Sequence, residues 1–475
     1  MSVGWQLRIG EQMHDRLHGH LFPGDEDEHA AVIAAGMVHT DRGTRLLARD
    51  LFLARDGIDF VPGRRSYRRL VPEFVNEKIR YCREQGLIYL SAHSHPGRGA
   101  VSFSGDDLKS HERGYPALLD ISGRPVGALV LSEDHLAADI WTADRSRRPL
   151  IETVIICRNL RRVYPQPPPP PTSADPMYDR AVRWFGERGQ DLLGQTKVAV
   201  IGAGGVGQPL IGMLARLGVG SILVIEPERI EPTNLPRMPE ARRLDAMMFL
   251  RRFPALDALA DRLSTSKVAL GRRVARRANP KVDFIGIRKN VNEPSASRAL
   301  VDCDFIFLAA DSHQARQITN IVAHQYLIPA IQIGTRIDVD SDSGEVGEIR
   351  GNVRLILPER GCLQCNRLIS AEKLQEESLP AAERERNRYV EEIPAPSVIN
   401  FNVHGAAQAV TDFTLMLGGF SDSVAPLGYL RWRPRRRREE PIEPFANDAE
   451  CPHCGSLPQS RRGRGEAMAL PGPER

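Results

Sequence analysis

The sequence predicts an α/β protein with a mixed α and β domain first and a doubly wound, mostly parallel sheet after it. Its 475 residues are too many for one compact core. Five consecutive prolines in YPQPPPPPTSAD form a semi-rigid spacer. Strand-like and helix-like patterns are mixed before this spacer and alternate after it. We therefore expect domains at 1–163 and 177–456, a Pro-rich linker at 164–176, and a disordered Gly-, Pro- and Arg-rich tail at 457–475.

The composition is that of a globular chain, with 41% hydrophobic and 26% charged residues. A net charge of +4 demands neither a nucleic-acid nor a membrane partner, and no apolar run reaches transmembrane length. The start lacks a secretory pattern, and seven cysteines, an odd number, argue against a disulfide framework. We expect a cytoplasmic protein. The local basic cluster RWRPRRRR (431–438) favours a solvated loop over a docking patch for an acidic partner.

In the first domain, AAVIAAGMV (30–38) and RLLARDLFLA (45–54) predict strands separated by a turn. VPEFVNEKIRYCREQG (71–86) predicts a helix, because its apolar residues recur at helical spacing and a glycine ends it. LIYLSA (87–92) predicts a buried strand that leads directly into His93.

The stretch HSHPGRGAVSFSGDD contains a possible metal site. Alternate residues of a strand point to one face, so His93 and His95 can aim at one point as the strand ends. The loop after Pro96 can return Asp107 to that point at the start of a helix. Three such ligands leave a fourth zinc position open, which is typical of a catalytic site. An H-x-H pair alone would instead favour two surface histidines.

The full pattern H-x-H-P, seven residues, then S-x-x-D resembles the JAMM (JAB/MPN) metalloproteases. That family has a cytidine-deaminase-like fold and cleaves isopeptide and peptide bonds at the C-terminus of ubiquitin or ubiquitin-like proteins. The resemblance covers most of residues 1–150 and implies His93, His95 and Asp107 as ligands of a catalytic zinc. It also implies that Ser104 steadies the tetrahedral oxyanion.

The acid/base glutamate of such a site has two candidates in DEDEHAAVIAAG. We favour Glu28 over Glu26 because it directly precedes the strand. The sequence departs from the family at Ala31, where a glycine is usual.

After the linker, the patterns predict an alternating series of strands and helices. They are KVAVIG, helical GGVGQPLIGMLARLG, SILVIE, helical SKVALGRRVARRAN, VDFIGI, DFIFLAA, a helix from Ser312, and PAIQIG. This order implies a mostly parallel sheet with helices on both faces.

A glycine loop, IGAGGVG, joins the first of these strands to the first helix. Its glycines let the backbone approach phosphates, and a helix N-terminus favours negative charge. The four glycines are Gly202, Gly204, Gly205 and Gly207. Alone, this loop would suit a dinucleotide-dependent dehydrogenase as well. The next strand ends in Glu226, which is suited to ribose hydroxyls.

The run EPERIEPTNLPR resembles the ubiquitin-activating superfamily (ThiF/MoeB), which includes bacterial enzymes that adenylate small sulfur-carrier proteins. The family pattern is acidic-x-acidic followed by S-N-L-x-R. Here Glu226 and Glu228 are the acidic pair, Thr233 replaces Ser, and Asn234 and Arg237 complete the pattern. The resemblance implies a Rossmann-like fold, ATP with magnesium, and a homodimer.

Further positions match this superfamily. The resemblance implies that Arg237 and Lys267 contact the nucleotide and that Asp311 binds magnesium. Arg180 would reach the nucleotide of a dimer mate. The segment Met238 to Ser266 is longer than in simple members and is expected to be an insertion on the ATP side.

Two C-x-x-C pairs, in GCLQCN and ECPHCG, can supply a closed tetrahedral zinc site. We expect a structural zinc on Cys362, Cys365, Cys451 and Cys454; a redox dithiol is the alternative. Members that form a thioester place a cysteine before the motif PAPSV, but Leu368 to Ser397 contains none. No catalytic cysteine is therefore assigned.

Together these patterns predict a bifunctional enzyme of a bacterial ubiquitin-like pathway. One half would trim or remove the modifier, and the other would adenylate its C-terminal glycine. The partners implied are that modifier and a conjugating enzyme. Activation and processing of a sulfur-carrier protein is the close alternative.

Overall fold

The computed structural model describes residues 4–61, 68–171, 175–340, 343–380, 383, 396–421, 427–443 and 446–471. The chain forms two compact units. The first comprises 1–170, 324–327 and 449–469, and the second comprises 171–323, 328–448 and 470–475. Within the described residues, no helix is long and apolar enough to cross a bilayer.

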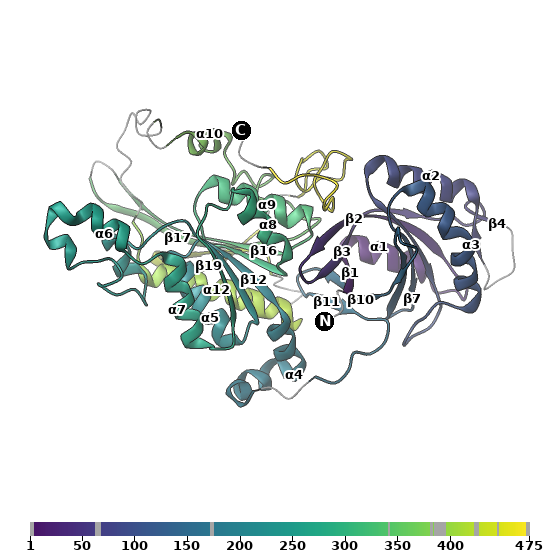
Figure 1. Ribbon diagram of the computed structural model, residues 1–475, viewed down its shortest axis with the longest axis horizontal. Coiled ribbons are helices and arrows are strands. Elements are labelled where there is room, and N and C mark those ends of the chain that lie inside the picture. Colours follow the sequence, from purple (N-terminus) through teal and green to yellow (C-terminus); the bar gives the residue numbers. More distant parts are fainter. Residues whose placement is uncertain are drawn as a thin grey trace. The chain divides into compact units, whose positions relative to one another are not determined.

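The first unit is built on a nine-stranded mixed sheet in the order β11-β10-β1-β3-β2-β6-β7-β8-β9 (Figure 1). Its strands are β1 (Gly4–Gly10), β2 (Ala30–Thr40), β3 (Gly43–Leu53), β6 (Ile88–Ser94), β7 (Val126–Leu131), β8 (Leu136–Trp141), β9 (Arg147–Arg148), β10 (Leu150–Ile156) and β11 (Arg161–Val163). A separate small pair is formed by β4 (Phe60–Val61) and β5 (Arg69–Leu70).

Helices cover both faces of this sheet. They are α1 (Glu11–Leu21), α2 (Pro72–Gln85) and α3 (Gly105–Ser122). Alternate residues of β2 point to opposite faces of the sheet and so enter two separate cores. Ala31 and Ile33 pack in one core with residues of α1. Val32 and Ala34 join a second core with residues of α2 and α3. The predicted strands and helix of this unit are thereby confirmed.

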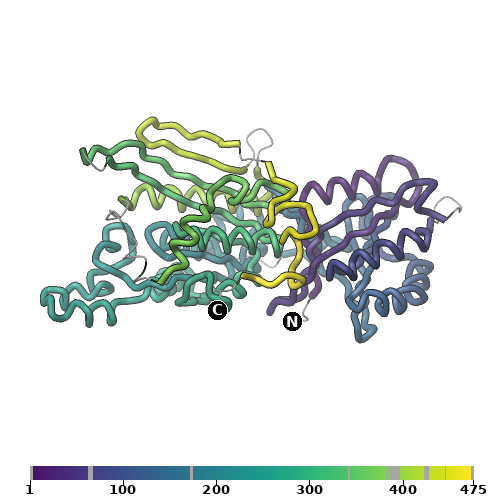
Figure 2. Tube along the Cα trace, turned by 90° about the horizontal axis from the view of Figure 1, so that it is seen from above, coloured from purple at the N-terminus to yellow at the C-terminus, as the bar shows by residue number. Residues whose placement is uncertain are grey.

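The C-terminal segment departs from the predicted disorder. Residues 457–471 are described, and Ser460 and Arg464 are 1% and 6% exposed. Gly465 forms a β-bridge with Met37 of β2, and the Arg49 side chain of β3 donates to the carbonyl oxygens of Leu457 and Arg462. Composition indicated disorder, but buried hydrogen bonds fix this segment on the first unit. Figure 2 draws this segment in the bright yellow of the C-terminal end of the chain.

The second unit is built on an eight-stranded sheet in the order β14-β13-β12-β15-β16-β17-β18-β19. Its strands are β12 (Lys197–Ile201), β13 (Ser221–Ile225), β14 (Asp283–Ile287), β15 (Phe305–Leu308), β16 (Ala330–Val339), β17 (Val346–Ile356), β18 (Tyr429–Arg433) and β19 (Arg438–Ile442). The first five are parallel, as predicted, and the last three pair antiparallel.

The helices of this unit lie on both sides of the sheet (Figure 1). They are α4 (Asp179–Gln195), α5 (Gly207–Leu217), α6 (Asp257–Leu263), α7 (Lys267–Ala278), α8 (Pro294–Ala299), α9 (His313–Gln325), α10 (Ala371–Ser378) and α12 (Ile399–Gly418). Short 3₁₀ turns are η1 (Pro176–Tyr178), η2 (Pro232–Arg237), η3 (Leu250–Arg252), η4 (Pro254–Leu256), η5 (Leu300–Asp302) and η6 (Pro434–Arg436). The doubly wound α/β prediction is confirmed for the parallel half.

The basic cluster 431–438 is the tip of a β-hairpin rather than a plain loop, because β18, η6 and β19 fall within or next to it. Arg435 donates to the carbonyl oxygens of Val346 and Gly347 at 2.6 and 2.5 Å.

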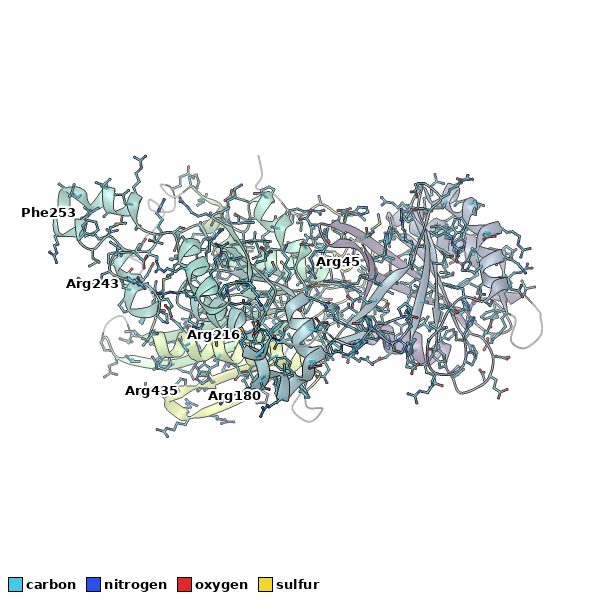
Figure 3. The ribbon with its side chains drawn as sticks, turned by 60° about the horizontal axis from the view of Figure 1, so that its bottom comes forward. Arg45, Arg180, Arg216, Arg243, Phe253 and Arg435 are labelled. Atoms are coloured by element: carbon cyan, nitrogen blue, oxygen red, sulfur yellow. The ribbon has the colours of Figure 1, made fainter. Side chains whose placement is uncertain are left out.

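The predicted insertion Met238 to Ser266 contains η3, η4 and α6. It exposes several large apolar side chains, including Phe249, Phe253 and Leu263. Phe253 and the exposed Arg243 of this segment are labelled in Figure 3.

Candidate functional sites

Two imidazoles and a carboxylate converge at the end of β6. The ligand atoms of His93, His95 and Asp107 all lie within 4.8 Å of one another. Nε2 of His93 is 3.6 Å from Oδ1 of Asp107, and Nε2 of His95 is 3.4 Å from Oδ2. These separations are too long for good hydrogen bonds, but they suit three ligands around one ion.

Local structure explains why these side chains meet. His93 is paired in two directions, with Ala30 of β2 and Val130 of β7, so the end of β6 lies inside the sheet. Asp107 is the third residue of α3 and closes a capping box with Ser104. The strand end is held by backbone hydrogen bonds of the sheet, and the helix start is held by the side-chain-to-backbone hydrogen bonds of the capping box.

The chemistry of this cluster fits a metal ion. Nε2 of His93 is buried and has no hydrogen-bond partner within the described residues, which is costly unless something binds it. Burial opposes the charge of Asp107, yet interactions with the facing imidazoles of His93 and His95 hold its pKa well below the usual range. The side chain is therefore an anionic ligand at any moderate pH.

Glu28 and Glu26 differ in their relation to this cluster. Glu28 is half-buried, and burial raises its pKa, while the charges of His93, His95 and Asp107 also act on it. Glu26 is exposed. The charges of all three ligand side chains therefore act on Glu28.

Ser104 lies beside the cluster with its hydroxyl engaged. It donates to Oδ2 of Asp107 at 2.7 Å and accepts from the Asp107 N–H at 3.1 Å. In this arrangement it orients Asp107. Its expected contact with an oxyanion stays a prediction.

The glycine loop forms a second site between β12 and α5. Gly202 has φ +90°, a left-handed conformation that favours glycine, and a Cβ there would lie 2.9 Å from the Ala310 nitrogen. A Cβ on Gly207 would overlap the Gly202 carbonyl oxygen. Gly204 in contrast meets nothing within 4 Å, so the loop is open where a phosphate would approach.

Buried hydrogen bonds connect this loop to the predicted acidic residue. Glu226 is 7% exposed, and its two carboxylate oxygens accept from the N–H groups of Ala203 at 2.8 Å and Glu228 at 3.0 Å. It therefore fixes the loop, and a contact with ribose hydroxyls stays a prediction.

Lys267 begins α7 and is 6% exposed. Its ammonium group is ion-paired with Glu228, and its carbonyl oxygen accepts from Nε2 of Gln208 at 2.9 Å. Gln208 also donates to the Ala203 carbonyl at 3.0 Å. Sequence reasoning missed Gln208, because no spacing signals a side chain that joins two backbone segments.

Two other predicted residues, Arg237 and Asp311, lie near the loop without a hydrogen bond to it among those described. A Cβ on Gly205 would lie 3.2 Å from the Arg237 carbonyl oxygen and 2.5 Å from Nδ2 of Asn402. Asn402 was also missed; it is buried, and its Oδ1 accepts from Thr335 at 2.9 Å. Asp311 is exposed and follows Ala310, the neighbour of Gly202.

Asn234 and Arg180, two further predicted residues, lie in surroundings unlike those of the glycine loop. Asn234 is 3% exposed, and its Oδ1 accepts from the Glu231 N–H at 3.2 Å, so it stabilises η2. Arg180 is exposed on α4 (Figure 3), and its contact with a dimer mate stays a prediction.

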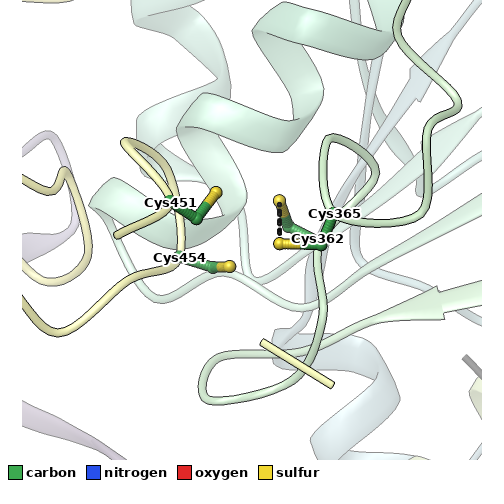
Figure 4. A group of neighbouring side chains, drawn as sticks. All are labelled: Cys362, Cys365, Cys451 and Cys454. Carbon is green, nitrogen blue, oxygen red and sulfur yellow. Dashed lines mark hydrogen bonds between the residues drawn. The ribbon is translucent and has the colours of Figure 1, made fainter. Parts of the chain in front are cut away.

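The four predicted cysteines form a cluster (Figure 4). Their sulfur atoms all lie within 4.8 Å of one another, and Sγ of Cys362 and Cys365 are 3.7 Å apart. Four thiolates at such distances fit a tetrahedral zinc site. The group comprises Cys362, Cys365, Cys451 and Cys454.

A parallel α/β sheet with a glycine loop, an acidic residue after the second strand and a lysine at a nearby helix start defines a Rossmann-like nucleotide-binding protein. The pattern of the ThiF family matches residues 178–419. The chain belongs to the ThiF family.

Curated relatives match parts of this region. The SAMP-activating enzyme E1 of Haloferax volcanii is 25% identical over 180 residues, which is 38% of this chain and 56% of the relative. The sulfur carrier protein ThiS adenylyltransferase of Bacillus subtilis is 28% identical over 145 residues, 30% and 39% of the two chains. The chain thus spans about half the length of the first and less of the second.

Among solved structures, Escherichia coli MccB with MccA-N7isoASN is similar. It has 18% sequence identity and a TM-score of 0.45, and the match covers 59% of this chain and 76% of that one.

Proposed function

We propose that the second unit uses ATP with magnesium to adenylate the C-terminal carboxylate of a ubiquitin-like or sulfur-carrier protein that ends in glycine. The observation that carries the proposal is the open glycine loop, hydrogen-bonded to Glu226 and joined to the Lys267 backbone through the Gln208 side chain, in a chain of the ThiF family. The names of the two curated relatives support the same substrate class.

The reaction joins a carboxylate oxygen of the carrier to the α-phosphorus of ATP. It breaks the bond between that phosphorus and the oxygen that leaves with pyrophosphate. Negative charge then grows on the leaving group, and nearby cations stabilise it. In this chain the glycine loop would hold phosphate oxygens, Arg237 and Lys267 would supply positive charge, and Asp311 would hold the magnesium ion. Lys267 must then exchange its partner Glu228 for phosphate.

The cysteines favour direct transfer of the adenylate over a thioester. Cys82, Cys157 and Cys303 are all buried, and burial raises the pKa of Cys82 to about 12 and that of Cys157 as well. A buried thiol with a raised pKa is a poor nucleophile. The remaining four form the cluster of Figure 4.

ATP–pyrophosphate exchange tests the proposal, with the Bacillus subtilis sulfur carrier ThiS and a Haloferax volcanii SAMP protein as probes. Exchange should require a carrier and should be lost in Asp311→Ala. The control Asp257→Ala removes another exposed carboxylate, from α6, and should behave as wild type. Carrier-independent exchange, or none with either probe, would contradict the proposal.

The fate of the carrier separates the two biological alternatives. A carrier thiocarboxylate, seen as a mass increase, would support sulfur transfer. A carrier linked through an isopeptide bond to lysine would support conjugation with a conjugating-enzyme partner.

We also propose a homodimer through this unit, because Met177, Trp184 and Phe420 are exposed near α4 and the end of α12.

We further propose that the first unit is a zinc-dependent peptidase or isopeptidase acting on the same carrier. The convergence of His93, His95 and Asp107, with an unpartnered buried nitrogen, carries this second proposal. Zinc held by three protein ligands lowers the pKa of water towards neutrality. Glu28 would accept a proton at its carboxylate and return it to the departing amine.

A carrier extended by six residues beyond its terminal glycine tests this second activity. The zinc-loaded protein should release the extension, detected by intact mass. Glu28→Gln should stop cleavage with zinc content unchanged, while Glu26→Gln should cleave normally. Cleavage by the Glu28 variant at the wild-type rate would contradict the assignment of Glu28 as the base.

A further inference from the structure

We infer that Ser94, the residue between the two imidazoles, positions the carboxylate of Glu28; this inference rests on the hydrolytic function proposed above. Ser94 is completely buried at the end of β6. Its hydroxyl oxygen accepts from the His29 N–H at 2.9 Å, and its own N–H donates to the His29 carbonyl at 3.0 Å. Both backbone groups of the residue after Glu28 are thus bound to Ser94.

These two bonds continue the sheet beyond its last regular pair. Strands β2 and β6 pair up to Ala30 and His93, so His29 and Ser94 lie one step outside the ladder. Glu28 precedes His29 and has no strand pairing of its own. Because β6 also carries both imidazoles, Ser94 ties the backbone beside Glu28 to the strand that holds the histidine ligands.

Other restraints on this backbone are weaker. Arg68 donates to the Glu28 carbonyl at 3.3 Å, and the His29 ring contacts Asp25 at 2.9 Å. The Asp25 side chain is 54% exposed, so solvent screens that contact. The bond from His29 to Ser94 is buried, and losing it would leave a backbone N–H unpaired.

Ser94→Ala tests the role in the full-length, zinc-loaded protein. The backbone bond from the Ser94 N–H to the His29 carbonyl remains, so the fold should persist, while the His29 N–H loses its acceptor. We expect faster hydrogen exchange at His29 and a 10- to 100-fold lower kcat on the extended carrier, since small displacements of catalytic groups have such effects. KM and zinc content should not change, because Ser94 is completely buried and is not one of the three proposed zinc ligands.

Two further variants make the result specific. Ser94→Thr keeps the hydroxyl and should restore the kcat and the slow exchange. Ser91→Ala removes another hydroxyl of β6, one that bonds Tyr115 at 2.9 Å, and should leave kcat and His29 exchange as in wild type.

The outcomes distinguish a failure of the positioning role of Ser94 from a failure of the proposed hydrolytic function. An unchanged kcat in Ser94→Ala, or a loss of zinc together with kcat, would overturn the positioning role. No cleavage by the wild-type protein would instead remove the hydrolytic proposal and this inference with it. Slower exchange at His29 in the Ala variant would contradict the hydrogen bond directly.

Discussion

At the scale of single residues, environment separates side chains that look alike in sequence. Glu28 and Glu26 occupy the same acidic run, but only Glu28 is half-buried beside the three ligand side chains. His93, His95 and Asp107 could be predicted because strand alternation is a local rule and the full H-x-H-P and S-x-x-D pattern resembles a known metalloprotease family. Ser94, Gln208 and Asn402 could not, because each bonds a backbone or side chain distant in sequence.

Asp412 of α12 gives a prediction on pH and stability. It is 5% exposed, and burial raises its pKa to about 6, while Gln408 donates to it at 2.8 Å. The folded state therefore holds a proton that the unfolded state releases near pH 4, and stability falls as the pH rises towards 6.

Asp412→Asn removes this penalty and keeps an acceptor for Gln408. At pH 8 it should increase the free energy of unfolding by up to about 3 kcal/mol, and at pH 5 by about half as much, because at pH 5 the unfolded carboxyl has already released its proton. Chemical denaturation at both pH values measures the difference. An equal gain at both would show that ionisation of Asp412 is not the cause.

At the scale of elements, the parallel half of the second sheet was predictable and the antiparallel half was not. Strand β12 and helix α5 are adjacent in sequence and have strong periodicity and a glycine turn. Strands β17 and β18 pair from Arg354 with Tyr429 to Gly351 with Trp432, and nothing local in either segment specifies that register.

The turn between β12 and α5 gives a second prediction. Gly207→Ala places a methyl group against the Gly202 carbonyl, so it should destabilise the unit by about 1–3 kcal/mol. Gly204→Ala meets open space and should keep wild-type stability. Thermal unfolding compares the two variants.

ATP binding by the Gly204 variant adds a separate readout. If the backbone here approaches a phosphate, Gly204→Ala should weaken ATP binding, measured by calorimetry, without a change in thermal stability. Full ATP affinity in this variant would mean that the phosphates lie elsewhere.

At the scale of the whole molecule, the two metal-ligand sets predict a stoichiometry. Elemental analysis should find two zinc ions per chain. His93→Ala should leave one, and the double variant Cys451→Ser with Cys454→Ser should leave the other. A single zinc in the wild-type protein that persists in His93→Ala would contradict the catalytic site.

The C-terminal segment predicts a stability effect in the first unit. The Arg49 side chain is fully buried and donates to the carbonyl oxygens of Leu457, Pro458 and Arg462. Arg49→Met removes these three charged hydrogen bonds. The Leu457 carbonyl keeps the Ser460 N–H and the Pro458 carbonyl keeps Arg464, but the Arg462 carbonyl loses its Arg49 donor, so the free energy of unfolding should fall by roughly 3 kcal/mol. Arg16→Met, at an exposed position of α1, is the matched control. Hydrogen exchange in β2 and β3 should accelerate only in the Arg49 variant.

The same segment sets an order of events during synthesis. Arg49 and Arg462 are 413 positions apart, and a ribosome adds roughly 5–20 residues per second. The nascent β3 strand would thus wait on the order of 20–80 s for its last neighbour to emerge. Throughout that interval a guanidinium destined for burial stays in water, and the opening half of the polypeptide cannot reach its final stability.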